Sequence, residues 1–84
     1  MLEEILVEKM KGLLDAELFE LYQDKLEADK QGMRPTKFDE YARLVMEFMA
    51  ERDSKIGIYN AYEMVLKVFY DEIARRYFTT FKYM

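Results

Sequence analysis

The sequence predicts an all-α protein, a small bundle of three main helices that forms a single helical domain over residues 1–84. Apolar residues recur at helical spacing along the chain, and only one proline and three glycines interrupt it. With 51% apolar residues the chain is too hydrophobic to stay disordered. Its short connections favour antiparallel neighbouring helices.

The first helical segment, residues 2–30, changes its apolar face midway. One sector of a straight helix carries apolar residues at first and acidic residues further along, while a second apolar group lies about a quarter-turn or more away. The early group is Leu2, Leu6 and Leu13, and the later group is Leu14, Leu18, Leu21, Tyr22 and Leu26. We therefore expect a break near Gly12 that splits this segment, with Asp15 as the new N-cap. The alternative is one long helix whose first turns pack on a different neighbour. Gly32 is the expected C-cap.

The second helix is predicted over residues 36–53. Thr36 can cap its start, and Asp39 lies three residues further on, as in a capping box. One face is apolar and the opposite face is charged, which is typical of a helix with one side in a core. The apolar face comprises Phe38, Tyr41, Ala42, Val45, Phe48 and Met49.

The third helix is predicted over residues 61–78, with Asn60 as its N-cap and Glu63 completing the box. Its main apolar stripe is Tyr62, Val65, Leu66, Phe69, Ile73 and Tyr77. Met64 and Val68 lie on the far side, so the helix is apolar over most of its circumference. Such a helix is usually central or contacts two neighbours, one of which can belong to another chain.

Composition argues against most enzyme classes. The chain has no cysteine, no histidine and a single serine, so the usual pairs of nucleophile and base cannot be assembled. There is also no glycine-rich loop for a phosphate. We expect a non-enzymatic protein without cofactor or bound metal.

The sequence also bears on the compartment. Two acids, Glu3 and Glu4, stand where a signal peptide would carry positive charge, and no apolar run approaches the roughly 20 residues of a membrane span. The absence of cysteine fits a reducing compartment. These features predict a cytoplasmic protein that does not bind membranes.

An acidic stripe is predicted on the first segment, where four carboxylates recur at helical spacing: Glu17, Glu20, Asp24 and Glu27. The simplest interpretation is a solvated helix face. A second is a phosphate mimic that contacts a basic partner. A third is a carboxylate metal enzyme, but the nearest second acidic pair, Glu47 and Glu51, lies on the polar side of its own helix.

The C-terminal third is both aromatic and basic. Residues 65–84 hold six of the thirteen aromatics, and residues 55–84 carry five bases and three acids although the whole chain has a net charge of −4. Tyr, Phe and Arg are enriched at protein interfaces, which makes this end the predicted partner-binding surface. Its residues are Met64, Val68, Tyr70, Arg75, Arg76, Phe78, Phe81 and Tyr83. The alternatives are burial within the domain and stacking on single-stranded nucleic acid, which the acidic net charge disfavours.

These features together predict a small helical protein that acts by protein–protein interaction, as a regulator, inhibitor or adaptor. Self-association as a homodimer is the simplest way to bury the surplus apolar surface of the third helix, since closed two-fold dimers are the commonest oligomers. The alternatives are a nucleic-acid-associated regulator that uses the basic aromatic end and an inhibitor that uses the acidic stripe.

Overall fold

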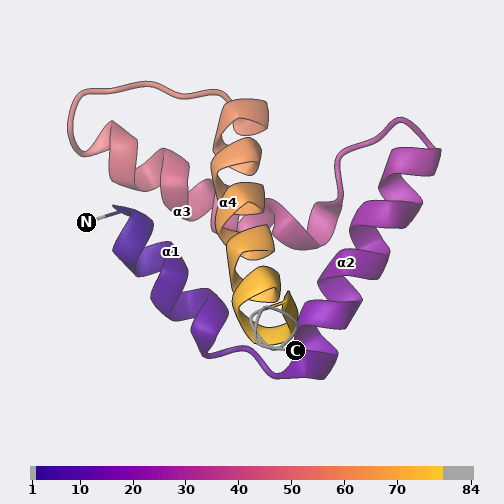
Figure 1. Ribbon diagram of the computed structural model, residues 1–84. Helices are drawn as coiled ribbons and strands as arrows, with labels where there is room; N and C mark the ends of the chain where they lie inside the picture. Colours follow the sequence, from indigo (N-terminus) through magenta and orange to yellow (C-terminus); the bar gives the residue numbers. More distant parts are fainter. Residues whose placement is uncertain (1, 79–84) are drawn as a thin grey trace.

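The computed structural model describes residues 2–78, and this part of the chain is helical without any strand. Its elements are α1 (Leu2–Lys11), α2 (Asp15–Lys30), a 3₁₀ turn η1 (Thr36–Phe38), α3 (Asp39–Ala50), α4 (Ile58–Ile73) and a π-helical turn η2 (Ala74–Phe78). The all-α prediction is confirmed for these residues. The number of main helices is four rather than three, because the first segment is divided (Figure 1).

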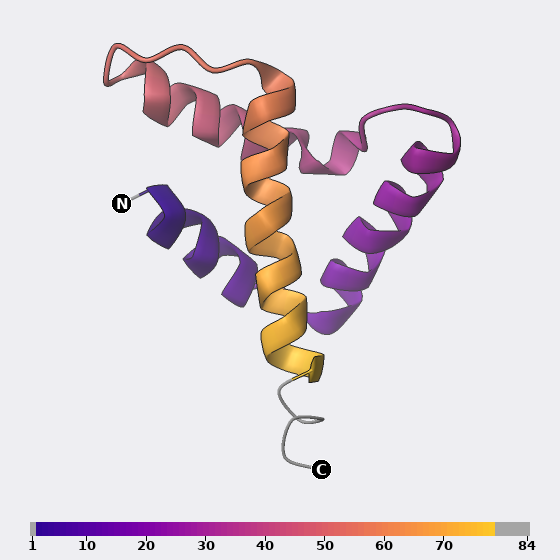
Figure 2. The ribbon, with the colours of Figure 1, turned by 45° about the horizontal axis from the view of Figure 1, so that its top comes forward.

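Helix α4 is the central element, as its broad apolar surface predicts. In Figures 1 and 2 it stands between α1 and α3 on one side and α2 on the other. It packs most closely against α3 and α1. Helix α2 meets the end of α4 at its own N-terminal end and then diverges from it, so the two helices form an open V (Figure 2).

The predicted break near Gly12 is confirmed. Helix α1 ends at Lys11 and α2 begins at Asp15. Asp15 is the first residue of α2 rather than its N-cap, since Leu14 holds the cap position. The N–H of Leu14 donates to the side-chain Oε1 of Glu17 at 2.8 Å, which satisfies one backbone donor at the helix start although Leu14 has no polar side chain to act as a cap.

Helix α2 ends near Gly32 as predicted, but its C-cap is Gln31, one residue before the predicted cap. Gln31 is the C-cap and Gly32 follows it with a φ of 66°, a left-handed conformation that glycine adopts without strain. The N–H of Met33 donates to the carbonyl of Ala28 at 2.8 Å. Gly32 donates to Asp29 in the same way at 3.2 Å, and the two bonds form a Schellman motif.

The start of the second predicted helix differs from the expectation. Thr36 does not cap an α-helix; it opens the turn η1, and α3 begins only at Asp39. The carboxylate of Asp24 accepts the N–H of Lys37 at 3.0 Å, so an acidic residue of α2 does the capping that the sequence assigned to Thr36. Helix α3 ends at Ala50, and a turn continues to Asp53.

Helix α4 starts three residues before the predicted position. Gly57 is the N-cap and Ile58 the first helical residue, so Asn60 lies inside the first turn. Ile58 packs against the core, which favours the earlier start. At the other end the π-helical turn η2 changes the angle per residue, and Tyr77 is left 43% exposed instead of continuing the buried stripe.

The core lies where the two predicted apolar stripes meet. Phe38 and Phe69 are fully buried, and their rings make an edge-to-face contact with centroids 5.1 Å apart. Tyr62 contacts Phe38 in a similar way at 5.8 Å. The other buried apolar residues are Leu2, Leu6, Met10, Leu18, Leu21, Ala28, Tyr41, Ala42, Val45, Ala61, Val65 and Val68.

Candidate functional site

The main apolar hollow of the described surface lies between α2 and the end of α4. We call it the aromatic groove. It has a volume of about 430 Å³ and is lined by Asp15, Leu18, Phe19 and Tyr22 from α2 and by Tyr70, Ile73, Tyr77 and Phe78 from α4 and η2. Its lining residues come from the first half of α2 and from the end of α4 with η2, the parts of the two helices that meet at the narrow end of the V (Figure 2). Five of its eight lining residues are aromatic, two from α2 and three from α4 and η2, so its wall offers ring faces and edges to an occupant.

The rings that line the groove are exposed. Phe78 is 61% exposed and Phe19 is 59% exposed. Tyr22 and Tyr70 are also exposed. Scattered apolar residues on a surface are ordinary, but several large ones around one hollow are typical of an interaction site.

Helix α2 carries two distinct apolar faces. Its buried residues are Leu18, Leu21 and Ala28. A second set, which we call the α2 stripe, consists of Phe19, Tyr22 and Leu26 and is exposed. The spacing of three and four residues places the stripe on one side of the helix, next to the buried face. Within the described residues this stripe is the least covered apolar part of α2.

Charged groups near the groove are already engaged inside the protein. Nζ of Lys25 lies 2.6 Å from a carboxylate oxygen of Asp29 and 5.7 Å from the ring centroid of Tyr70. The hydrogen bond that Lys25 donates to the Asp29 carboxylate raises the pKa of Lys25 above its usual value, so this side chain stays protonated. Asp15 accepts a hydrogen bond from Arg76 at 2.9 Å. The groove therefore selects an apolar occupant rather than a strongly charged one.

The predicted partner-binding residues do not lie on one surface. Tyr70 and Phe78 line the aromatic groove. Met64 is exposed on α4 but does not line it, and Arg75 is exposed beside Glu72. Phe81 and Tyr83 lie outside the described residues.

Two members of the predicted set point inward. Val68 is only 5% exposed, because α4 packs against α1 as well as α3 and its buried face is correspondingly wide. The side chain of Arg76 is 17% exposed and makes its hydrogen bonds within the chain. In this structure neither side chain is on the open surface where the sequence placed it.

The acidic stripe of α2 divides into two kinds of residue. Asp24 accepts the N–H of Lys37 and Glu17 accepts the N–H of Leu14, so both stabilise turns of the backbone. Glu20 and Glu27 are exposed. Within residues 2–78 no three acidic side chains are grouped so that they could hold a metal ion, and Glu47 and Glu51 lie on α3 and directly after it.

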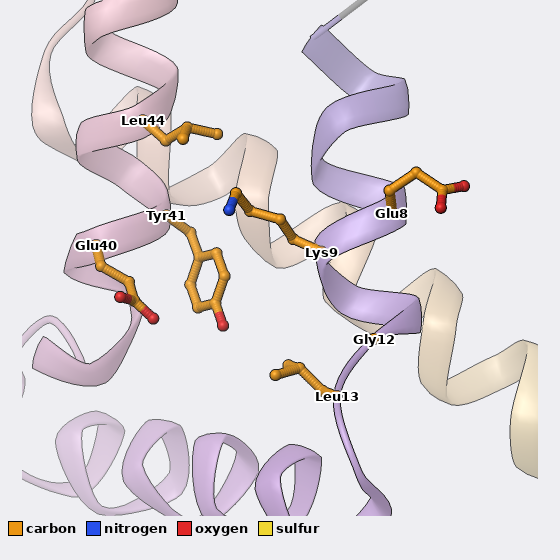
Figure 3. Close-up of a pocket in the computed structure, with 7 residues that line it drawn as sticks. All are labelled: Glu8, Lys9, Gly12, Leu13, Glu40, Tyr41 and Leu44. Carbon is orange, nitrogen blue, oxygen red and sulfur yellow. The ribbon is translucent and has the colours of Figure 1, made fainter.

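A second hollow, of about 410 Å³, lies between α1 and α3. Figure 3 shows Tyr41 and Leu13 pointing into this space, and Lys9 extending toward Tyr41. Burial, together with the charge of neighbouring Glu40, raises the pKa of the Tyr41 hydroxyl, so the phenol stays neutral. Three of its seven lining residues are charged, with both signs present, so this hollow is less apolar than the aromatic groove and a weaker candidate.

The contribution of α2 to the site was not predicted from the sequence. Tyr22 and Leu26 were expected in the same apolar group as Leu18 and Leu21, and Phe19 had no predicted role. The available signal was the spacing of Phe19, Tyr22 and Leu26, which forms a stripe distinct from the residues that became buried. A helix with two adjacent apolar faces has more apolar surface than one neighbour can cover.

No protein-family model, curated protein or solved structure matches the chain. Among the described helices, none combines the length and the hydropathy that a membrane crossing needs.

Proposed function

We propose that this chain is a small helical protein without catalytic activity that acts by binding protein, and that the aromatic groove is its binding surface. The observation that carries the proposal is the gathering of exposed rings from two helices around one hollow, above all Phe19 from α2 and Phe78 from η2. Proteins recognise amphipathic helices in this way, by receiving apolar anchors in a groove between helices.

The position of the groove supports this role physically. Full burial of a fully exposed phenylalanine contributes about 1.5–3 kcal/mol to the free energy of binding. Phe19 and Phe78 are only partly exposed, so burial of each ring by an occupant contributes a fraction of this amount. Because the groove walls belong to two helices held together at one end, the hollow exists before an occupant arrives. A preformed site loses less conformational entropy on binding.

The basic aromatic end gives less support to a role with nucleic acid. Arg76 makes its hydrogen bonds with Glu72, Asp15 and backbone carbonyls, so it is not directed at an external phosphate. Similarly, Asp24 and Glu17 cap the chain's own backbone, which takes half of the acidic stripe away from phosphate mimicry.

A site-specific photo-crosslinker tests the proposal directly. Phe19 is replaced by benzoylphenylalanine, which keeps an aromatic side chain in the groove, and the protein is illuminated in extract of the cells that make it. The matched control carries the same group at Met33, which is 59% exposed and lies outside the groove. A protein adduct of defined mass at Phe19 and not at Met33 is expected. No adduct with any protein, or the same adducts from both positions, would contradict the proposal.

A further inference from the structure

We propose that the aromatic groove is filled by α2 of a second copy of this chain, packed antiparallel to α2 of the first copy about a two-fold axis beside Tyr22. The inference rests on the proposed function and names its partner. The same surface carries both the hollow and apolar side chains that can fill it. Phe19 and Tyr22 of the α2 stripe line the groove, and all three residues of the stripe are exposed to a second copy. A self-complementary patch of this kind is what a two-fold dimer requires.

The second apolar face of α2 is exposed because the helix packs against little of the rest of the chain. Of its sixteen residues only Leu18, Leu21 and Ala28 are buried, and the helix diverges from α4 (Figure 1). Its closest packing is against η1 rather than against another long helix. A helix in a protein is stabilised mainly by the packing of its apolar face, so the second face of α2 is a surface where a partner helix adds stability.

The order of residues along α2 favours its own copy as that partner. When two α2 helices lie antiparallel, positions at equal distances on either side of Tyr22 and Gln23 face each other. Phe19 then faces Leu26, so apolar side chains meet along the seam. At the two ends of the seam Asp15 faces Lys30, so opposite charges meet twice across the interface.

The remaining charges of α2 do not oppose this arrangement. Asp15 is 72% exposed even though it accepts a hydrogen bond from Arg76, so it is accessible to a second cation. Glu20 follows Phe19 by one residue and therefore lies about 100° further round the helix, away from the seam. The acidic face stays in solvent, where the like charges of the two copies remain apart.

In the resulting dimer the two α2 helices lie side by side at the centre, each in the groove of the other copy. Tyr70, Ile73 and Phe78 of each copy would contact the α2 stripe of its partner. The two α2 and two α4 helices then form a four-helix arrangement with a shared core.

The first test is the solution mass of the full chain by light scattering over a hundredfold dilution. Twice the chain mass is expected at high concentration. Phe19→Asp, which places a charge in the seam, should weaken the dimer by at least about a hundredfold. Met33→Asp is the control, because it puts the same charge on an equally exposed apolar residue outside the groove and should leave the dimer intact. A monomer at every concentration, or a dimer that survives Phe19→Asp, overturns the proposal.

Two further variants test the register. Lys30→Glu should raise the dissociation constant of the dimer by roughly threefold to tenfold, since the exposed pair with Asp15 occurs twice. Lys55→Glu makes the same change of charge in the loop before α4 and should not alter it. Because the chain has no cysteine, Gln23→Cys gives one thiol beside the axis, and a short bismaleimide should link two copies. Failure to link while Gln31→Cys links efficiently overturns the antiparallel register.

The same measurements separate this inference from the proposed function. A monomeric chain whose photo-adduct at Phe19 contains a different protein would leave the groove as a protein-binding site and remove self-association. A monomeric chain that forms no protein adduct would remove both.

Discussion

Arg76 and Glu72 form an ion pair at the last turn of α4, with Nε of the arginine 2.6 Å from a carboxylate oxygen of the glutamate. The Glu72 side chain is 3% exposed. The other nitrogens of Arg76 donate to Asp15 and to the carbonyls of Met10, Lys11 and Leu13 at 2.8–3.2 Å. One side chain thereby binds carbonyls at the end of α1 and in the link that follows, where the regular hydrogen bonds of the helix stop.

This network explains how the break at Gly12 is held. The π-helical turn η2 directs Arg76 toward the link between α1 and α2, while its neighbour Arg75 stays exposed and also pairs with Glu72. Three helices are therefore joined at one point. The junction fixes the narrow end of the V between α2 and α4, and with it the shape of the aromatic groove.

We expect Arg76→Ala to lower the free energy of unfolding by about 3 kcal/mol, because it leaves the buried Glu72 carboxylate without its main partner. Arg76→Lys should recover only part of this loss, since an ammonium group cannot reach the same set of acceptors. Arg75→Ala is the control and should cost less, about 1 kcal/mol, because the Arg75 side chain is itself exposed and the buried Glu72 carboxylate keeps Arg76 as a partner. Urea unfolding checks all three. Equal losses of unfolding free energy in Arg76→Ala and Arg75→Ala would show that Arg76 does not hold the three helices together.

The same ion pair predicts a dependence on pH. Burial alone would raise the pKa of Glu72, but the hydrogen bonds and charges of Arg76 and Arg75 outweigh it and hold the pKa below its ordinary value of 4.5. A carboxyl whose pKa is lower in the folded state stabilises the fold above its unfolded pKa. That contribution is lost as the pH falls through the lower, folded value.

Glu72→Gln should therefore cost about 3 kcal/mol at pH 7 and progressively less below pH 4.5. Arg34 and Asp39 form another ion pair that lowers the pKa of Asp39, but both proteins retain it and its effect cancels in the difference. Urea unfolding of the two proteins between pH 7 and pH 3 measures that difference. If it stays constant over the whole range, Glu72 does not titrate as the structure requires.

Phe69 is the residue on which the core depends most directly. It is fully buried and its ring meets that of Phe38 edge to face. Phe69→Ala should lower the free energy of unfolding by about 3–5 kcal/mol through lost burial and the remaining cavity. Tyr59→Ala is a suitable comparison on the same helix, because Tyr59 is 65% exposed. A small loss at Phe69, similar to that at Tyr59, would mean that the core is packed differently.

Within the acidic stripe, Asp24 and Glu20 should respond differently to the same substitution. Asp24→Ala removes the acceptor for the N–H of Lys37 and should cost about 1 kcal/mol, as the loss of a helix cap does. Glu20→Ala should change the stability by no more than about 0.5 kcal/mol, since Glu20 is exposed. Thermal unfolding of both variants measures the difference. A loss of stability at Asp24 but not at Glu20 is expected, and no loss at either residue would mean that the whole acidic stripe is solvated.

Much of the fold followed from apolar spacing and helix signals. The apolar faces around Phe38 and Phe69, the break near Gly12 and the end of α2 just before Gly32 were all predictable, because each depends on residues close together in the sequence. The starts of α3 and α4 were displaced, since a carboxylate from α2 and the packing of Ile58 decided them. Those are tertiary contacts that a local signal does not contain.

The candidate site was predicted only in part, for the same reason. Tyr70 and Phe78 were identified by composition, but the exposure of Phe19 depends on the angle at which α2 leaves α4. The inward direction of Arg76 depends on a π-helical turn and on the carbonyls at the end of α1. Neither the interhelical angle nor the π turn can be derived from the periodicity of one helix.

The proposed dimer also predicts how thermal stability varies with protein concentration. An association that only folded chains make raises the melting temperature as the concentration rises. For a chain of this length the increase should be about 4 °C for each tenfold rise above the dissociation constant. Phe19→Asp should abolish the dependence while leaving the melting temperature at low concentration nearly unchanged, because the ring is 59% exposed in the single chain. Met33→Asp should keep it. A wild-type melting temperature that is independent of concentration would mean that the α2 stripe is not covered by a second copy.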